Sequence, residues 1–224
     1  MTTTTDPAGP STETTSTVDD LVTRIVEWGK AYADTMAETT GQELQRLVFE
    51  RGPKEVNEMG RMLYRHPNVL SSQDFKRFAN FAGSQYFPVV LFDAWSFGKI
   101  TRETLQAELG PAWSGAHYPD RLLPRREWRH LFATAGFTVD GVPAEHPEQP
   151  LELFRGSVPV RRRDWSWTTD RAMADKYATG GIQGRPRGRV YRVVAPPSAL
   201  LCANFDRKES EYVVDTRGLR ITEA

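Results

Sequence analysis

Two glutamates near the C-terminus are spaced as a pair of catalytic carboxylates could be. In the stretch "RKESEYVVD", Glu209 and Glu211 stand one residue apart, directly before an apolar run typical of a buried strand. Side chains at alternate positions of a strand point to the same face, so the two carboxylates are expected to be neighbours. Like charges held that close repel each other and cost folding free energy. The pair is therefore either a solvated strand edge that discourages aggregation or a site with chemistry to perform.

Two stretches upstream carry further groups that could bind an anion or a sugar. "LFRG" places Arg155 in a predicted strand ahead of Gly156, a residue type that lets a ligand approach the backbone closely. In "DWSWTTD", strand alternation places Ser166 and Thr168 on one face, where hydroxyls can hold a carboxylate or a ribose. Taken alone, Arg155 is more typical of a surface charge or of an ion pair. Its meaning depends on the residues that stand beside it.

The segment around these hydroxyls predicts a short helix packed on a sheet. Trp165 and Trp167 are expected on the strand face opposite the hydroxyls. In "DRAMADKYA", the spacing turns Ala174, Tyr177 and Ala178 to one side of a helix. Such a stripe is typical of a helix that packs against a sheet, and it would support a site without taking part in the chemistry.

The overall composition predicts a globular protein without structural disulfides. The chain has 224 residues, of which 39% are hydrophobic and 11% aromatic, enough to bury a core. A single cysteine, Cys202, cannot form an intrachain disulfide, and the histidines lack zinc-ligand spacing, so no metal is expected. Neither a basic and apolar leader nor an apolar run long enough for a bilayer is visible. We therefore expect a cytoplasmic protein that does not contact the membrane.

The chain divides into four segments of different composition. Residues 1–17 are rich in Thr and Ser and are expected to be disordered. Residues 18–140 repeat apolar positions at helical spacing and predict a helical region. Residues 141–150, with three prolines behind a turn-forming Asp-Gly, predict a linker. Residues 151–224 read as short strands with one helix, so the sequence predicts an α+β protein whose helices precede a small sheet.

Charge is unevenly distributed, although the whole chain is formally neutral. Residues 151–224 carry 14 Lys and Arg against 9 Asp and Glu, a net charge of +5 that the remainder of the chain balances. A basic segment with Arg185, Arg187 and Arg189 in one loop suits an anionic partner such as a dinucleotide or a nucleic acid. The glycines of "TGGIQG" follow a predicted helix instead of preceding one, which excludes a Rossmann phosphate loop there.

The order of these elements resembles the signature of the ADP-ribosyltransferase family. That signature is an arginine on one strand, a Ser-x-Ser motif on a second strand that runs into a helix, and a glutamate on a third. Here the three positions hold Arg155, Ser166 and Glu211, and the helix carries the pattern "AxxYA" at a matching distance. The resemblance covers residues 151–224, with Thr168 as the last serine, a tryptophan in the middle, and a short interval after the arginine. It implies a split-sheet, ADP-ribosyltransferase-like core on which the helical N-terminal part packs.

The family likeness implies a binding site for NAD, which serves as co-substrate. Arg155 would bind the pyrophosphate, a task that suits the bidentate geometry of a guanidinium. Ser166 would make a hydrogen bond that orients the catalytic glutamate, and Thr168 would brace the same pocket. Gly156 and Tyr177 would complete the wall that binds NAD.

The same likeness implies separate tasks for the two glutamates. Glu211, which matches the invariant glutamate, would accept a hydrogen bond from the ribose 2′-hydroxyl. It would also stabilise the oxocarbenium-like cation that forms as nicotinamide leaves. Glu209 would orient or deprotonate the incoming nucleophile. In this family a glutamate at that position is typical of members that modify arginine.

The expected function is mono-ADP-ribosyl transfer from NAD to a protein side chain, with arginine as the indicated residue. Two enzymatic alternatives keep the NAD chemistry: hydrolysis of NAD to ADP-ribose, and transfer to a nucleic acid base. A non-enzymatic alternative is a helical interaction module whose sheet binds a partner or binds NAD inertly. The sequence leaves open whether the role is that of a toxin, a regulator or a defence factor.

Overall fold

The structure describes most of the chain from residue 56 onward. A computed structural model describes residues 56–116, 118–180, 186–206 and 210–224, together with positions 23, 27 and 54. The tail predicted over 1–17 and most of the helices expected before residue 54 lie outside these ranges. Most of the "TGGIQG" loop, Arg185 and Glu209 lie outside them as well, and the predictions that rest on them stay predictions.

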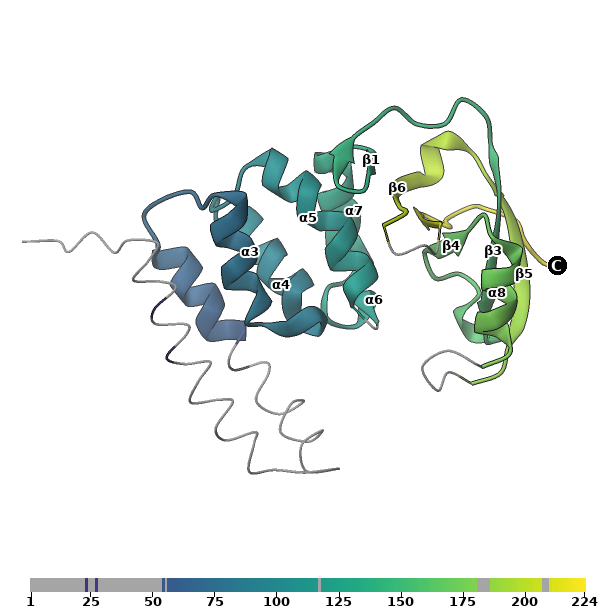
Figure 1. Ribbon diagram of the computed structural model, residues 1–224, viewed down its shortest axis with the longest axis horizontal. Coiled ribbons are helices and arrows are strands. Elements are labelled where there is room, and N and C mark those ends of the chain that lie inside the picture. The colour runs from purple at the N-terminus through teal and green to yellow at the C-terminus, as the bar shows by residue number, and fades with distance from the viewer. Residues whose placement is uncertain are drawn as a thin grey trace, which may run out of the picture.

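The described chain is an α+β structure in which a helical layer stands beside a sheet, as Figure 1 shows. The predicted fold class is confirmed at that level. Side chains complete two helix starts, since Ser71 accepts a hydrogen bond from the Asp74 amide and Thr101 from the Thr104 amide. No helix within the described ranges is long and apolar enough to cross a membrane. Residues 56–65 are helical, and the helices that follow are α3 Ser72–Asn80, α4 Gly83–Ser96, α5 Arg102–Gly115, α6 Pro119–Leu122 and α7 Arg125–Ala135.

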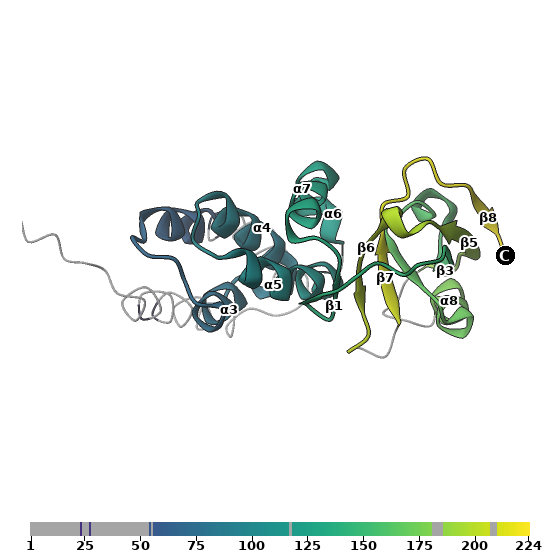
Figure 2. The same cartoon turned by 90° about the horizontal axis from the view of Figure 1, so that it is seen from above.

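Eight strands of the described chain form one mixed sheet, in the order β2-β1-β6-β7-β4-β3-β5-β8. Neighbouring strands run antiparallel, except β1 and β6, which are parallel. Figure 2 shows β6 and β7 on the side of the sheet nearer the helices, with β5 and β8 away from them. The strands are β1 Thr138–Val139, β2 Val142–Pro143, β3 Leu151–Ser157, β4 Ser166–Thr168, β5 Arg189–Ala195, β6 Leu200–Asn204, β7 Glu211–Val214 and β8 Ile221–Glu223, and helix α8 Arg171–Ala178 follows β4.

The sheet starts earlier in the sequence than the predicted linker allows. β1 and β2 form a hairpin around Asp140 and Gly141, whose φ angles of 49° and 78° are positive, as a type I′ turn requires at both central residues. β1 then pairs with β6 through Val139 and Ala203. The Asp-Gly pair is therefore a hairpin turn, and the boundary predicted at residue 141 falls inside the sheet.

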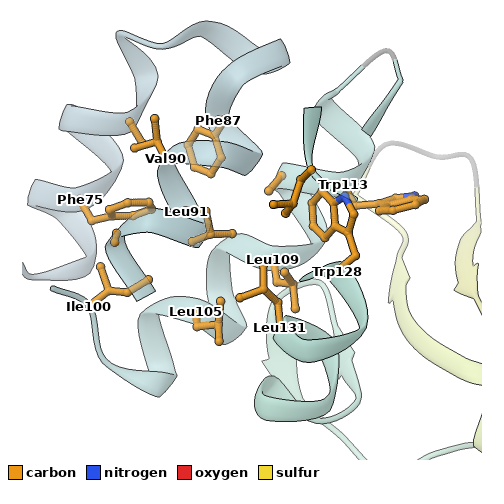
Figure 3. Packing of buried hydrophobic residues seen from close by; sticks show 14 of the residues in the cluster. Phe75, Phe87, Val90, Leu91, Ile100, Leu105, Leu109, Trp113, Trp128 and Leu131 are labelled. Carbon is orange, nitrogen blue, oxygen red and sulfur yellow. The ribbon is translucent and has the colours of Figure 1, made fainter. Parts of the chain in front are cut away.

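An apolar cluster joins the helices to the sheet. It contains Leu109 and Trp113 of α5 together with Trp165, Cys202 and Val213 of the sheet region. Figure 3 shows the helical side of this cluster, with the Trp113 ring at its edge. Burial of apolar surface is the main favourable term in folding, so the helical part and the sheet stabilise each other.

The two tryptophans predicted to share a strand face lie in different clusters. Trp165 belongs to the cluster that contains the helices, whereas Trp167 packs with Leu153 and Val214 in a second cluster. β4 begins only at Ser166, so Trp165 precedes the strand and is not subject to its alternation. The prediction is wrong for Trp165, which faces the helices.

Candidate functional site

A cavity of about 120 Å³ lies where the helical layer meets the sheet. Its walls come from helices α5 to α8, the segment between α5 and α6, the segment before β4, and strands β3, β4 and β7. It is smaller than the roughly 300–1,000 Å³ of pockets that enclose a drug-sized ligand, and suits one ring or sugar better than a whole dinucleotide. All the described site candidates line it: Arg155, Gly156, Ser166, Thr168, Tyr177 and Glu211.

Strand register places the two hydroxyls and one carboxylate on the same face. Thr168 stands opposite Glu211, and Ser166 opposite Val213, in the antiparallel pair of β4 and β7. Directly opposed residues of neighbouring strands have their side chains on one face. Val213 belongs to the cluster that contains the helices, so this face looks toward the helical layer.

The strand that carries Glu211 is shorter than predicted. β7 begins at Glu211, and Ser210 before it has a φ of 45°, in the left-handed region. Strand alternation needs extended backbone at the residue between the two glutamates, and Ser210 is not extended. Strand alternation, which predicts Glu209 and Glu211 on one face, therefore does not hold at Ser210. Glu209 itself lies outside the described residues, and its catalytic role stays a prediction.

Two residues that the sequence did not indicate hold the carboxylate of Glu211. The hydroxyl of Ser114 on α5 donates a hydrogen bond to Oε2, and Nδ2 of Asn204 on β6 lies 3.3 Å from the same oxygen. Ser166, which was expected to orient Glu211, instead accepts a hydrogen bond from Nε1 of Trp113 at 3.0 Å. Donors from α5 and β6 therefore orient the carboxylate.

An ion-pair cluster forms one wall of the cavity. Among the described residues that line it, three arginines and two aspartates belong to this cluster. Asp164 lies 2.8 Å from Arg125 and 3.1 Å from Arg155, and it also pairs with Arg161. Asp120 lies 2.9 Å from Arg125 and 3.6 Å from Arg161. The cluster has one more positive than negative charge, so it would attract an anion while its arginines stay largely compensated.

Arg155 is the most deeply placed arginine of the cluster, and its contacts are internal. Its register partner is Tyr191, on the face of the second apolar cluster, and the guanidinium reaches the cavity past the start of β4. There it donates to the carbonyl oxygens of Ser166 (2.7 Å) and Arg161 (3.2 Å) and to the carboxylate of Asp164. These contacts fix the segment that leads into β4, a task that differs from the predicted binding of a pyrophosphate.

Gly156 allows α8 to pack closely on β3. A Cβ atom at this position would lie 2.0 Å from the carbonyl oxygen of Ala174 and 2.5 Å from the amide nitrogen of Ala178. Only a residue without a Cβ allows the helix to lie this close to β3. Gly156 also lines the cavity, and its predicted role in ligand approach stays a prediction.

Thr168 and Tyr177 form part of the wall that α8 completes. Thr168 is buried, and its hydroxyl accepts a hydrogen bond from the backbone amide of Asp170 at 3.0 Å. Asp170 in turn accepts from the amides of Ala172 and Met173, which starts α8. Thr168 thus ties the end of β4 to the helix that carries Tyr177.

Aromatic rings and guanidinium groups alternate around the cavity. Trp113 stacks on Trp165 with ring centroids 5.3 Å apart and an interplanar angle of 18°. Two guanidinium groups lie over the ring of Tyr118, in the segment before α6, with Arg121 at 4.6 Å and Arg161 at 4.5 Å from its centroid. Faces of aromatic rings attract cations and stack on planar ligands. The walls therefore suit a flat ring beside a sugar.

The only cysteine of the chain, Cys202, is buried and has a thiol of low reactivity. Burial raises the pKa of the Cys202 thiol well above its ordinary value, and the charge of Glu211 raises it further. A thiol in this condition stays protonated at neutral pH and is a poor nucleophile. Covalent catalysis by Cys202 is therefore not part of the chemistry that this site favours.

No family model matches this chain, and no curated protein and no solved structure matches it either. The distinguishing feature of the cavity is one carboxylate fixed by two hydrogen bonds within a wall of aromatic and guanidinium groups.

Sequence reasoning missed the residues that approach the site from elsewhere in the chain. Asn204 gave a signal, because a polar residue in the apolar run "LLCAN" must find a partner when it is buried. Ser114 and Tyr118 gave none, since they belong to the helical region that was assigned no chemistry. Asp164 stands two residues before Ser166, yet its pairing with three arginines follows only from the folded structure.

Proposed function

We propose that this protein is an ADP-ribosyltransferase that cleaves NAD at the bond between nicotinamide and ribose and transfers ADP-ribose to a protein side chain. The observation that carries the proposal is the convergence of Glu211, Ser166 and Thr168 on one cavity face of two neighbouring strands. A carboxylate beside sugar-binding hydroxyls suits a reaction in which positive charge develops on a ribose ring.

Charge stabilisation by Glu211 is the central step of the proposed reaction. The glycosidic C–N bond breaks, its electron pair leaves with nicotinamide, and the ribose carbon becomes an oxocarbenium-like cation. Oε2 of Glu211 accepts hydrogen bonds from Ser114 and Asn204, and we assign Oε1 to the ribose 2′-hydroxyl. A carboxylate that is already oriented stabilises this cation without reorganisation, which is the main source of such rate enhancements. The acceptor nucleophile then bonds to the ribose carbon and loses a proton.

The size of the cavity limits which part of NAD it encloses. About 120 Å³ suits nicotinamide with part of its ribose, so the rest of the dinucleotide lies outside in the proposed complex. The pyrophosphate then contacts Arg125 and Arg161, whose side chains are 31% exposed, in preference to Arg155, which is 10% exposed. Arg155 acts as a clamp for the segment before β4.

The acceptor is a protein side chain, with arginine favoured by the glutamate at position 209 in the family likeness. The nucleic acid alternative loses one of its supports, because Arg189 pairs with Glu223 at 2.7 Å. The non-enzymatic alternative is favoured by a specific observation, namely the internal pairing of the cavity arginines in a small cavity. It predicts that NAD is not consumed.

Release of nicotinamide from NAD tests the proposal. Purified full-length protein is incubated with NAD and a cell lysate as the source of acceptors, and free nicotinamide is measured by chromatography. We expect release by the wild type and a loss of at least roughly 100-fold in Glu211→Gln, the size typical of a removed charge-stabilising group. Glu152→Gln is the matched control, because Glu152 is half-exposed and pairs with Arg192 on the surface. A wild type that releases no nicotinamide, or a fully active Glu211→Gln, would show that the proposal is wrong.

A further inference from the structure

The carboxylate of Glu211 accepts hydrogen bonds from two parts of the chain that lie far apart in sequence. Ser114, on α5, and Glu211 are 97 residues apart, and Asn204 comes from the neighbouring strand β6. Nδ2 of Asn204 lies 2.8 Å from the hydroxyl oxygen of Ser114, so the three polar groups form a closed triangle. Each group has a partner, which is what a buried polar cluster requires in order to hold one arrangement.

A glycine in α5 makes room for the amide of this triangle. Gly110 lies one helical turn before Ser114, and a Cβ atom on it would lie 2.3 Å from Oδ1 of Asn204. Glycine within a helix costs about 1 kcal/mol relative to alanine, so its presence there calls for a structural reason. That reason is the close approach of Asn204, whose side chain any larger residue would displace. Asn204 is buried and cannot move into solvent without disturbing β6.

Helix α5 is anchored firmly enough to act as a fixed support. Leu105 and Leu109 bury one side of it in the helical cluster, as Figure 3 shows. Near its C-terminal end, Trp113 stacks on Trp165 and donates a hydrogen bond to Ser166, which ties the helix to β4 as well. Ser114, the next residue, is therefore held in place relative to both layers.

We infer that Ser114 and Asn204 are positioning residues for Glu211, and that Gly110 is required for this arrangement. The inference rests on the proposed function for its catalytic meaning. It assigns to the helical part an active-site task, since the donor that aims the carboxylate comes from α5. The orientation of the Glu211 carboxylate matters most in the transition state, where positive charge develops on the ribose. The loss of a donor therefore lowers kcat and leaves the KM for NAD little changed.

The catalytic test compares variants that remove one donor each. Ser114→Ala and Asn204→Ala are expected to lower kcat for nicotinamide release by roughly 10- to 100-fold, with KM for NAD within a few-fold. Ser114→Thr keeps the hydroxyl and is expected to restore most of the activity. Ser96→Ala is the matched control, because Ser96 is an exposed serine at the end of α4.

A second measurement does not depend on activity. Urea unfolding midpoints are compared for wild type, Gly110→Ala, Asn204→Ala and the double variant, in a double-mutant cycle. Gly110→Ala is expected to lower the midpoint in the wild-type background. It should leave the midpoint unchanged or raise it when Asn204 is already alanine, because the obstructing side chain is gone and alanine favours the helix.

The outcomes separate this inference from the proposed function. A wild type that does not release nicotinamide overturns the proposed function. An active wild type whose kcat survives both Ser114→Ala and Asn204→Ala overturns the positioning role alone. Additive midpoint shifts in the cycle overturn the part assigned to Gly110.

Discussion

The indole Nε1 of Trp113 donates a hydrogen bond to the hydroxyl of Ser166 at 3.0 Å, and this contact links the helical layer directly to the Ser-x-Ser strand. The same indole stacks on Trp165 and meets Trp128 edge-on, with centroids 5.0 Å apart. One residue of α5 therefore belongs at once to the helical core and to the wall of the cavity. The site is not a property of the C-terminal segment alone.

The C-terminal segment is expected to be unable to fold by itself. A fragment of residues 137–224 would keep every strand of the described sheet but would expose Trp165, Cys202 and Val213, which the helices bury. A domain of under ~100 residues without disulfide or metal has little stability to spare. Thermal unfolding followed by circular dichroism should show no cooperative transition for the fragment, in contrast to the full chain. A cooperative and active fragment would make the helical part a separate domain with its own purpose.

Arg155 is expected to contribute more to the stability of the fold than to the binding of NAD. Arg155→Lys removes the forked contacts to Asp164 and to two carbonyl groups, which one ammonium group cannot replace. We expect a loss of roughly 2–4 kcal/mol in the free energy of unfolding, because the part-buried partners are left incompletely paired. Arg192→Lys, at a half-exposed pair with Glu152, should cost under about 1 kcal/mol. Urea denaturation measures both, and a stable Arg155→Lys that merely binds NAD weakly would restore the role predicted from the family likeness.

Gly156→Ala tests the packing of α8 on β3. The new Cβ would meet backbone atoms of Ala174 and Ala178, which cannot rotate away, so α8 must shift. We expect a loss of about 3 kcal/mol or somewhat more in stability, at the upper end of overpacking effects. Gly115→Ala serves as the control, since a Cβ there would make only an ordinary contact, 3.9 Å from Ser84. If Gly156→Ala is as stable as the wild type, α8 is not seated on Gly156 as described.

Two glutamates on α5 are expected to respond to neutralisation in opposite directions. Burial raises the pKa of Glu108, which the charge of Lys76 lowers only in part, so ionised Glu108 costs stability. Its raised pKa makes the folded state favour the proton, and stability is therefore lost as the pH rises through the folded pKa. Glu108→Gln should raise the urea midpoint at pH 7.5, and the gain should shrink as the pH falls through the raised folded pKa and be absent below the unfolded value of 4.5.

Glu103 provides the control on the same helix. A hydrogen bond to its own backbone amide and one from Thr101 lower the pKa of this first-turn glutamate. Its stabilisation is present above the unfolded pKa and disappears as the pH falls through the folded one, so Glu103→Gln should lower the midpoint at pH 7.5. A Glu108→Gln variant that behaves like Glu103→Gln would show that the Lys76 pair outweighs the burial of Glu108.

Local patterns predicted the parts of the site that strand geometry controls. Alternation put Ser166 and Thr168 on one face correctly, because both lie within the regular strand β4. It failed for Trp165, which precedes the strand, and at Ser210, where a left-handed residue interrupts it. The Asp-Gly pair at 140 and 141 was a hairpin signal that the neighbouring prolines concealed.

Contacts between residues far apart in the chain could not be predicted from local sequence patterns. Nothing in the spacing of Ser114 or Asn204 indicates that both reach Glu211, since the contact depends on how α5 packs on β6 and β7. The same limit applied to Arg155, whose type suggested a ligand and whose position gave it Asp164 instead. Residue type predicts what a side chain can do, and the tertiary neighbours decide what it does.

Glu209 is expected to separate the two halves of the proposed reaction. Its side chain lies outside the described residues, so the prediction rests on the family likeness alone. If Glu209 activates the acceptor, Glu209→Gln leaves the departure of nicotinamide assisted by Glu211 and lets water replace the acceptor. Slow hydrolysis of NAD then survives, while labelled ADP-ribose no longer appears on protein.

If the acceptor is an arginine, its guanidinium group needs a general base, and Glu209 is the residue predicted to serve as that base. A guanidinium group, with a pKa above about 12, is a poor nucleophile while protonated, and a positioned carboxylate that removes the proton can supply roughly 10²- to 10⁴-fold. The measurement uses cell lysate with radiolabelled NAD and compares wild type, Glu209→Gln and Glu211→Gln for hydrolysis and for protein labelling. Equal loss of both activities in Glu209→Gln would mean that this residue serves the ribose or the fold. Arginine would then have no support as the acceptor.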